Sequence, residues 1–312
     1  MSTPSNAFSV STMQAALKAA DVYKKITYVD DVAMEWIQVP DCKYTVKLDL
    51  ISATPSFVAN GPNWSGTGNV TITEKSKNVN DVKAELSLWK RSLEQKFATA
   101  NVTCAMKGNL DPYQMMIEQV IVEPLANSKQ SAMWFSSSTF STYGIIDELK
   151  ADSARLVTAS YSGATGPATS AVTVSTIDEF VDAFVARASA DIISQPNLKL
   201  YIGANLFSLF LQNQRAAFGT LAMQNVEQAK TGTMRYSYLG GPFSLEIVGV
   251  KALNDTTYGV LTSTDNLYHL FNCSDQESVA SEYNFEHNML LFRVEGQFAA
   301  TYGDAALIVT NF

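Results

Sequence analysis

Apolar and polar residues alternate with a period of two in two stretches near the start of the chain. Over residues 43–50 every second side chain is apolar, namely Tyr44, Val46, Leu48 and Leu50. The same alternation returns over residues 82–88, with Val82, Ala84, Leu86 and Leu88. Because successive side chains of a strand point to opposite faces, each stretch is predicted to be a half-buried β-strand. We predict that these two strands pair with each other.

The segment between the two predicted strands, residues 52–81, is rich in Pro, Gly, Asn and Ser. Its centre, residues 60–68, consists of turn-forming residues around a single tryptophan, Trp64. A two-stranded excursion is only marginally stable alone in water, and loops this long are uncommon inside compact domains. We therefore predict a projecting hairpin that lies on a neighbouring molecule. The candidate residues for this contact are Asn60, Trp64, Gly66, Gly68, Lys75 and Lys77.

After the second predicted strand, the spacing of apolar residues changes to that of a helix. Asp111 and Pro112 are suited to the N-cap and the first position of a helix. Apolar residues then recur at helical spacing, at Tyr113, Met116, Ile117, Val120 and Ile121. Pro124 would kink or end this helix, because proline lacks the amide hydrogen and its ring clashes with the preceding turn. If the helix continues to Met133, we expect it to be long and bent.

The second half of the chain predicts a helix between strands. Residues 176–179 match a capping box, with Thr176 as N-cap and Glu179 reaching back to it. The helix would run to Asp191 with one continuous apolar face, and a strand over residues 198–202 and a helix from Gly203 would follow. Further strands are predicted over residues 243–250, 258–262, 290–299 and 305–311. Residues 1–42 mix Ser, Thr and Ala with one short helical patch, which is typical of an arm that gains order by contact.

Composition narrows the class of protein. The 312 residues can form one large domain or two, and only 17% are charged, below the ~25% usual for soluble domains. This depletion fits a surface covered by neighbouring subunits, and it equally fits an ordinary neutral-polar protein. The net charge of −8 argues against an electrostatic nucleic-acid binder, which needs a basic face. No apolar run is long enough to span a bilayer and no secretory signal is present, so we expect a cytoplasmic chain without a membrane partner.

No combination of residues predicts catalysis, a cofactor or a metal ion. Cys42, Cys104 and Cys273 are widely spaced and form no CxxC motif, which favours buried reduced thiols. His269 and His287 have no metal-ligand spacing, and a cysteine nucleophile would have only these two as partners.

Motifs for hydrolase and nucleotide chemistry are also missing. The sequence contains no GxSxG, no GxxxxGK[ST] and no complete GxGxxG. Trp64, Trp89 and Trp134 have no basic cluster beside them, so we interpret them as packing or contact anchors rather than base-stacking residues.

Taken in chain order, these elements resemble the major capsid proteins of tailed bacteriophages, which have the Hong Kong 97 fold. The resemblance is carried by the glycine-rich hairpin, the Asp111-Pro112 helix leading to Ala132-Met133-Trp134, the run Tyr143-Gly144-Ile145-Ile146, and the 176–191 helix followed by the 198–202 strand. It implies an α+β fold with an N-terminal arm, an extended hairpin loop, a peripheral domain with a long spine helix, and an axial domain. The matching ranges are 1–42 for the arm, 43–90 for the loop, 91–143 with 273–312 for the peripheral domain, and 144–272 for the axial domain.

The resemblance also implies a function. Such proteins self-assemble through hexamers and pentamers into the icosahedral head shell around double-stranded DNA. The implied location is the virion, after assembly in the host bacterial cytoplasm, with portal, scaffolding and decoration proteins as further partners. DNA would be held by confinement, since no basic tract is present.

Three finer expectations depend on this resemblance. Because the arm follows Met1 at once, we expect a separate scaffolding protein or assembly without one. Lys75 and Lys77 are the hairpin lysines available for the lysine-to-asparagine cross-link that some relatives form, and the sequence identifies no partner asparagine. Two alternatives remain, an encapsulin-like cellular nanocompartment shell and an enzyme of unrecognised mixed fold.

Overall fold

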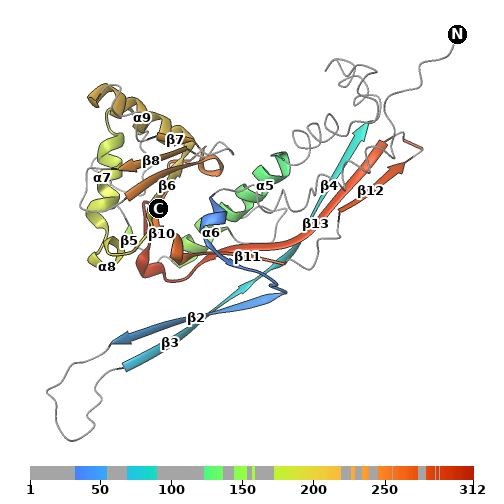
Figure 1. Ribbon diagram of the computed structural model, residues 1–312, viewed down its shortest axis with the longest axis horizontal. Helices are drawn as coiled ribbons and strands as arrows, with labels where there is room; N and C mark the ends of the chain where they lie inside the picture. Colours follow the sequence, from blue (N-terminus) through green and yellow to red (C-terminus); the bar gives the residue numbers. More distant parts are fainter. Residues whose placement is uncertain are drawn as a thin grey trace, which may run out of the picture.

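The computed structural model describes residues 32–54, 69–89, 123–135, 144–152, 157–158, 172–218, 226–228, 234–238, 245–254, 256–272, 279–284, 286–287 and 289–312. Figure 1 shows three parts: a compact domain of sheet and helices, a long narrow sheet with a helix beside it, and a two-stranded hairpin that projects away from both. Of the sequence predictions, the short helical patch near the N-terminus, the Asp111-Pro112 helix start, Cys104 and Cys273 lie outside the described ranges.

The compact domain is built on a sheet whose described strands number seven and follow the order β5-β14-β10-β6-β9-β8-β7. Its strands are β5 (Val157–Thr158), β6 (Leu198–Gly203), β7 (Val226–Gln228), β8 (Met234–Tyr238), β9 (Leu245–Val250), β10 (Gly259–Ser263) and β14 (Val309–Thr310). Beside them lie the helices α7 (Ile177–Arg187), α8 (Ala190–Ile193) and α9 (Ala204–Phe218). β6 runs parallel to β9 and antiparallel to β10, so this is a mixed sheet.

Both faces of the central part of this sheet are buried, and alternate residues of β6, β9 and β10 enter different cores. Leu200 on β6 and Ile247 on β9 pack with α7 and α9, in a core that includes Phe184. The next residues along the strands, Tyr201 and Val248, belong to a second core on the opposite face. Every described residue of β6 is therefore buried, which explains its nearly continuous apolar sequence.

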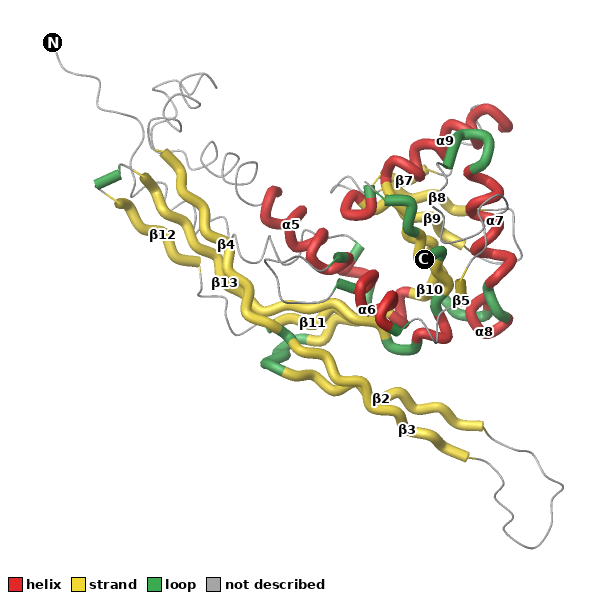
Figure 2. Tube along the Cα trace, turned by 180° about the vertical axis from the view of Figure 1, so that it is seen from behind, coloured by secondary structure: helices red, strands yellow, loops and turns green. Residues whose placement is uncertain are grey.

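A second sheet forms the long arm of the molecule. Its members are β1 (Ile37–Val39), β4 (Asn80–Trp89), β11 (Leu267–Phe271), β12 (Val279–Asn284) and β13 (Met289–Tyr302). β13 is the central strand and pairs antiparallel with β4, β11 and β12. Figure 2, seen from behind, shows α5 (Glu123–Trp134) beside this sheet and α6 (Ile145–Ala151) where the sheet meets the compact domain.

The chain crosses between the two sheets through short 3₁₀ turns, and hydrogen bonds tie these crossings together. η7 (Thr264–Asn266) joins β10 to β11, and η8 (Ala305–Leu307) lies between β13 and β14. The Asn266 side chain donates to the Asp304 carbonyl at 2.9 Å and accepts from the Asp304 amide at 2.8 Å. The compact domain and the long sheet are thus continuous through two linked crossings. Two further 3₁₀ turns are η1 (Ala33–Glu35) and η6 (Lys251–Leu253).

The hairpin consists of β2 (Thr45–Thr54) and β3 (Asn69–Asn78), which pair antiparallel from Thr45–Asn78 to Thr54–Asn69. The predicted first strand is confirmed, but its predicted partner is wrong. Residues 82–88 lie in β4, which pairs with β13 instead. The period-two signal located both strands correctly, yet strand pairing depends on a partner more than two hundred residues away that alternation cannot identify.

Most of the predicted helices and strands of the second half are confirmed. A helix at Ile177–Arg187, the strand Leu198–Gly203 and the helix Ala204–Phe218 occur as expected. The capping box is wrong, because the Thr176 side chain makes no cap hydrogen bond and its hydroxyl oxygen accepts from the Thr173 amide at 3.0 Å. The helix also ends at Arg187, before the predicted Asp191. Residues 305–311 form a 3₁₀ turn and a two-residue strand rather than one strand.

Pro124 stands at the second described residue of α5, and the helix continues past it to Trp134. The predicted continuation to Met133 is confirmed, whereas the course of the helix before Glu123 lies outside the described residues.

Candidate functional site

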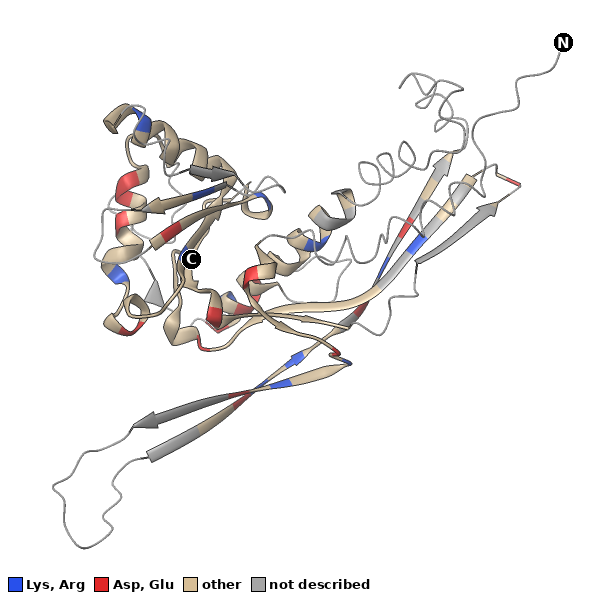
Figure 3. Cartoon of the chain, viewed as in Figure 1, with Lys and Arg blue, Asp and Glu red and all other residues tan. Residues whose placement is uncertain are grey.

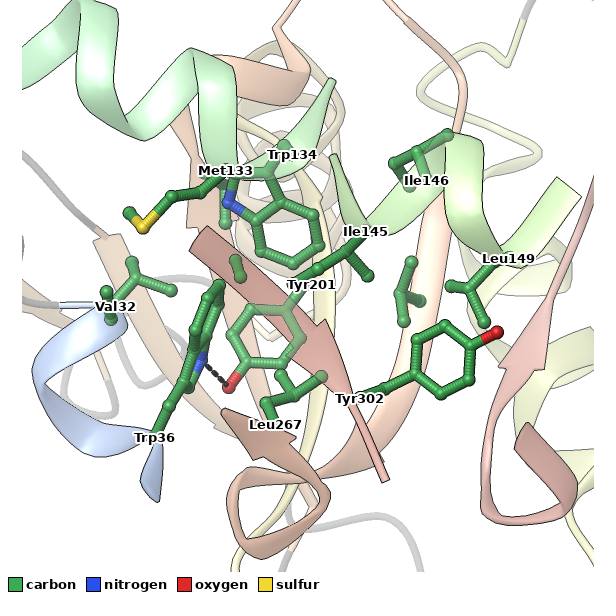
Figure 4. Packing of buried hydrophobic residues seen from close by; sticks show 14 of the residues in the cluster. Val32, Trp36, Met133, Trp134, Ile145, Ile146, Leu149, Tyr201, Leu267 and Tyr302 are labelled. Atoms are coloured by element: carbon green, nitrogen blue, oxygen red, sulfur yellow. Dashed lines mark hydrogen bonds between the residues drawn. The ribbon is translucent and has the colours of Figure 1, made fainter. Parts of the chain in front are cut away.

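The compact domain and the long sheet meet around a cluster of aromatic side chains (Figure 4). The Trp134 ring at the end of α5 lies 5.6 Å from Trp36 and 5.4 Å from Tyr201, measured between ring centroids. The Trp36 indole nitrogen donates to the Tyr201 hydroxyl at 3.4 Å. Tyr302 from β13 belongs to the same buried core. Side chains from the N-terminal segment, α5, β6 and β13 therefore share one core, which makes the compact domain and the long sheet a single folded body.

A group of four charged side chains holds the N-terminal segment against the compact domain. Lys199 on β6 contacts Glu35 of η1 and Glu246 of β9, each at 2.6 Å. Arg235 on β8 also pairs with Glu35. The two negative and two positive charges of this partly buried group cancel. Removal of any one of these side chains would therefore leave an uncompensated charge.

The base of the hairpin is attached on one side by a small apolar cluster. Cys42 and Val79 pack with Leu270 on β11 and Ala299 on β13. Cys42 is a buried free thiol, as predicted, and its backbone amide donates to the Phe271 carbonyl at 3.1 Å. This cluster fixes the point at which the chain turns from the long sheet into the hairpin.

On its other side the hairpin base is attached by ion pairs to Glu148 of α6. The carboxylate of Glu148 lies 2.8 Å from the Lys75 ammonium and 2.7 Å from the Lys77 ammonium. The Thr301 hydroxyl donates to the same carboxylate at 2.9 Å. Lys75 also donates to the Tyr302 carbonyl at 3.0 Å, and its nitrogen lies 3.1 Å from the centre of the Tyr302 ring. One acidic residue on α6 thus holds two successive inward-facing lysines of β3.

Burial and charge act in opposite directions on this group. Burial by itself would raise the pKa of the Glu148 carboxyl, but the neighbouring Lys77 and Lys75 hold that pKa below its ordinary value. Burial lowers the pKa of the Lys75 ammonium, and the attraction of Glu148 only partly offsets this. The Glu148 carboxylate is therefore the ionised centre of the attachment.

Beyond Lys75, residues 72–74 of β3 are exposed. Ile72 on β3 has 65% of its surface exposed and pairs in register with Ile51. Lys47 and Glu74 form an ion pair of 2.8 Å across the two strands, with both side chains more than half exposed. In Figure 3 charged positions of both signs lie along the hairpin. The described part of the hairpin thus presents both charged and apolar side chains to solvent.

A second exposed apolar position lies at the far end of the long sheet. Trp89, the last residue of β4, is 57% exposed and pairs in register with Met289 of β13. Leu291, two residues further along β13, is 38% exposed. Glu85, nearer the middle of β4, pairs with Lys83 at 3.1 Å and with Arg293 at 3.7 Å. On the face of the sheet that carries Glu85 and Trp89, charged side chains therefore lie near the middle of β4 and apolar side chains lie near its end.

The predicted contact residues divide into two groups. Asn60, Trp64, Gly66 and Gly68 lie outside the described residues, so their role stays a prediction. Lys75 and Lys77 are described, and both ammonium groups are paired with Glu148 of their own chain. A contact of either lysine with another subunit would be made in addition to this pairing.

Sequence reasoning missed Glu148 and Ile72. Glu148 stands 71 residues from Lys77 in the chain, on a short helix whose sequence predicts nothing about the hairpin. Ile72 did carry a signal, because it is a large apolar residue within a polar, turn-rich segment. Of the other tryptophans, Trp134 is a packing residue and Trp89 is exposed, and a contact of Trp89 with another molecule stays a prediction.

His269 is a buried residue of β11, in keeping with its interpretation as an ordinary strand position. Its Nδ1 lies 2.8 Å from the Gln38 side-chain oxygen, and its ring stacks on Phe271 at 5.1 Å. Burial, and secondarily the charge of Lys129, lowers the pKa of this imidazole well below its ordinary value. Within the described ranges, no group of three His, Cys, Asp or Glu side chains is placed to hold a metal ion. None of the helices described there has the length and apolar character that a membrane crossing requires.

Comparison with known proteins identifies the fold. No family model matches the chain, and no curated protein matches it in sequence. Among solved structures, a chain of the satellite phage P4 procapsid, which includes the size determination (Sid) protein, is 12% identical with a TM-score of 0.58, and the match covers 94% of this chain and 98% of that one. A chain from the capsid of the native GTA particle is 13% identical with a TM-score of 0.50, covering 89% of each chain. The chain therefore has the Hong Kong 97-like capsid fold, as the sequence resemblance predicted.

Proposed function

We propose that this chain is a major capsid protein that self-assembles into the icosahedral head shell enclosing the double-stranded DNA genome of a tailed bacteriophage. The observation that carries this proposal is the combination of a capsid fold over nearly the whole chain with a projecting hairpin that exposes Ile72. The proposed role is structural and not enzymatic.

The physical argument starts from surfaces that one subunit leaves uncovered. Ile72 is exposed on the hairpin and Trp89 is exposed at the end of the long sheet. The surfaces around these two residues differ from each other and lie on different parts of the molecule. When unlike surfaces of identical subunits meet, the contact is heterologous, and it generates closed rings if the rotation between subunits closes. Hexamers and pentamers of an icosahedral shell are rings of this kind, so such contacts suit shell formation.

We assign the parts of the chain by the same fold. Residues 1–42 form the N-terminal arm, 43–90 the extended loop, 91–143 with 273–312 the peripheral domain, and 144–272 the axial domain. Within the loop range, the hairpin itself ends at Asn78 and β4 belongs to the long sheet. Asn60, Trp64, Gly66, Gly68, Lys75 and Lys77 remain the proposed contact residues.

The partners that accompany this function are other copies of the chain, a portal protein, a scaffolding protein and decoration proteins. The shell would be part of the virion and would assemble in the host bacterial cytoplasm. DNA would be enclosed without sequence-specific contact, because a chain with a net charge of −8 attracts phosphates weakly. Positive and negative residues are interspersed over the face seen in Figure 3, which supports enclosure by confinement.

Assembly of the purified full-length chain tests the proposal. We expect closed particles of uniform size by negative-stain microscopy and light scattering, either from the chain alone or after co-expression with its neighbouring gene products. A compact monomer under all of these conditions would contradict the proposal and favour an enzyme or another monomeric role. Particles that enclose a cellular protein, with no DNA packaged by the phage machinery, would favour a nanocompartment shell instead.

A further inference from the structure

We infer that Glu148 is a positioning residue that sets the direction in which the hairpin leaves the body of the subunit. It does so by holding Lys75 and Lys77 of β3 against α6 and β13. The consequence for shell geometry rests on the proposed function, whereas the positioning itself is a property of the single subunit.

The position of the two lysines along the hairpin is the first argument. On β3 the residues Glu74, Ser76 and Asn78 are exposed, and Lys75 and Lys77 face inward between them. Residues 72–74, on the tip side of Lys75, are all exposed. Figures 1 and 2 agree that the β2–β3 hairpin projects away from the body. The contacts of Lys75 with Glu148 and with the Tyr302 carbonyl are the attachments nearest the hairpin tip in the described part of the chain.

The apolar attachment alone cannot determine the direction. Cys42 and Val79 are buried at the turn into the hairpin, where β3 ends at Asn78 and β4 begins at Asn80. A contact at the pivot fixes where the hairpin starts but leaves its angle free. At ~3.3 Å per residue, Lys75 stands about 13 Å from Val79 and the end of β3 at Asn69 about 33 Å from it. A displacement at Lys75 would be enlarged about 2.5-fold at Asn69.

Glu148 is the central member of this attachment because its carboxylate contacts both ammonium groups. Asp152 accepts from the Tyr302 hydroxyl at 3.2 Å, and its charge acts to raise the pKa of Lys75. Without the Glu148 charge, two partly buried ammonium groups on one face of a strand would lose the carboxylate that joins them to α6, whereas Lys75 would keep its contact with the Tyr302 carbonyl. Burial with less counter-charge is unfavourable, so β3 would be held less firmly against α6.

The experiment measures the direction of the hairpin in the full-length subunit before assembly. Nitroxide labels are attached to cysteines at the exposed positions Thr73 and Ser189, in a background with Cys104 and Cys273 replaced by serine and with Cys42 buried. Electron–electron double resonance then gives the distribution of distances between hairpin and compact domain. We expect a narrow distribution for the unaltered chain. In Glu148→Gln it should be shifted or broader, since Thr73 stands about 20 Å from Val79 and a displacement at Lys75 would be enlarged about 1.5-fold there.

A matched control uses the other lysine–glutamate pair of the hairpin. Glu74 contacts Lys47 at 2.8 Å, but this pair is exposed and lies within the hairpin itself. Glu74→Gln should therefore leave the distance distribution unchanged. A narrow, unshifted distribution in Glu148→Gln would overturn the inference, and so would equal broadening in both variants.

A second variant covers the case in which Glu148→Gln does not fold. The triple variant Lys75→Ser, Lys77→Ser and Glu148→Ser leaves no unpaired charge at the site, and its short side chains no longer join β3 to α6. It should fold and also show a broadened distribution, and a narrow one would overturn the inference. Failure of the unaltered chain to form shells would count against the proposed function and leave this subunit measurement unaffected. If shells do form, Glu148→Gln should widen the distribution of particle diameters relative to Glu74→Gln.

Discussion

The compact domain and the hairpin are both built on β-strands but are stabilised in opposite ways. In the compact domain β6 is buried on both faces, and its residues enter two apolar cores. In the hairpin, residues 72, 74, 76 and 78 of β3 are all exposed, and its described attachments to the body lie at its base. The compact domain therefore contains the apolar contacts that stabilise it, whereas the conformation of the hairpin depends on what it touches.

This difference indicates that different parts of the molecule determine the stability of the subunit and its assembly with other subunits. Burial of apolar surface dominates folding, so substitutions in the compact domain should act on the free energy of unfolding. A projecting two-stranded ribbon contributes little to that free energy, so substitutions there should act on contacts between subunits. Each prediction below tests this separation.

The largest expected effect is on the core of the compact domain. Phe184 of α7 is fully buried and packs edge-to-face on Phe180 at 5.2 Å. Phe184→Ala should lower the free energy of unfolding by about 3–5 kcal/mol, because it removes buried surface and leaves a cavity. Urea denaturation of the subunit measures this. Phe218→Ala, on an α9 residue that is 63% exposed, is the control and should change it by less than about 0.5 kcal/mol.

A smaller effect should appear with pH at the long sheet. The pKa of His269 lies well below its ordinary value in the folded chain because of burial, so the unfolded chain binds the proton more strongly. The contribution of the neutral imidazole to the free energy of unfolding is complete above the pKa of the unfolded chain, about 6.5, and decreases as the pH falls below that value. His269→Gln should lose this part of the pH dependence of the urea midpoint. His287→Gln, at an exposed position, should retain it, and equal behaviour of both variants would contradict this account.

Ile72→Asp should separate assembly from stability within the hairpin. Because Ile72 is exposed, the free energy of unfolding of the subunit should change by less than about 0.5 kcal/mol. The yield of shells by light scattering should fall strongly, since a charge would be placed in an apolar contact. Ser76→Asp is the control at an exposed position of the same strand. Normal shell yield in Ile72→Asp would mean that the hairpin does not use this residue between subunits.

The smallest effect is expected for the exposed ion pair of the hairpin. Glu74→Gln removes the partner of Lys47, and both side chains are more than half exposed. Exposed pairs are screened by water and salt, so no measurable change in the urea midpoint should follow. A clear loss of stability would show that the hairpin contributes to folding far more than its exposure indicates.

Particular residues show which predictions the sequence could make. The strand at residues 43–50 and the helix beginning at Ile177 were predicted because apolar periodicity is a local property that burial of one face imposes. The pairing of residues 82–88 with the hairpin was wrong, because β4 finds its partner in β13 far along the chain. The Thr176 cap was wrong for a different, local reason, since its hydroxyl oxygen accepts from the amide of Thr173, three residues earlier. The contacts of Asn60, Trp64, Gly66 and Gly68 remain predictions.

The sequence by itself determined the order of elements, the α+β class, the turn-rich hairpin and the resemblance to a capsid protein. These features depend on local spacing and composition, which can be seen in the sequence without knowing which segments meet. Only the tertiary structure decided that Glu148 meets Lys75 and Lys77, and that Trp36, Trp134 and Tyr201 share one core. Such contacts join residues far apart in the chain, and their geometry follows from packing of the whole body, which no local pattern encodes.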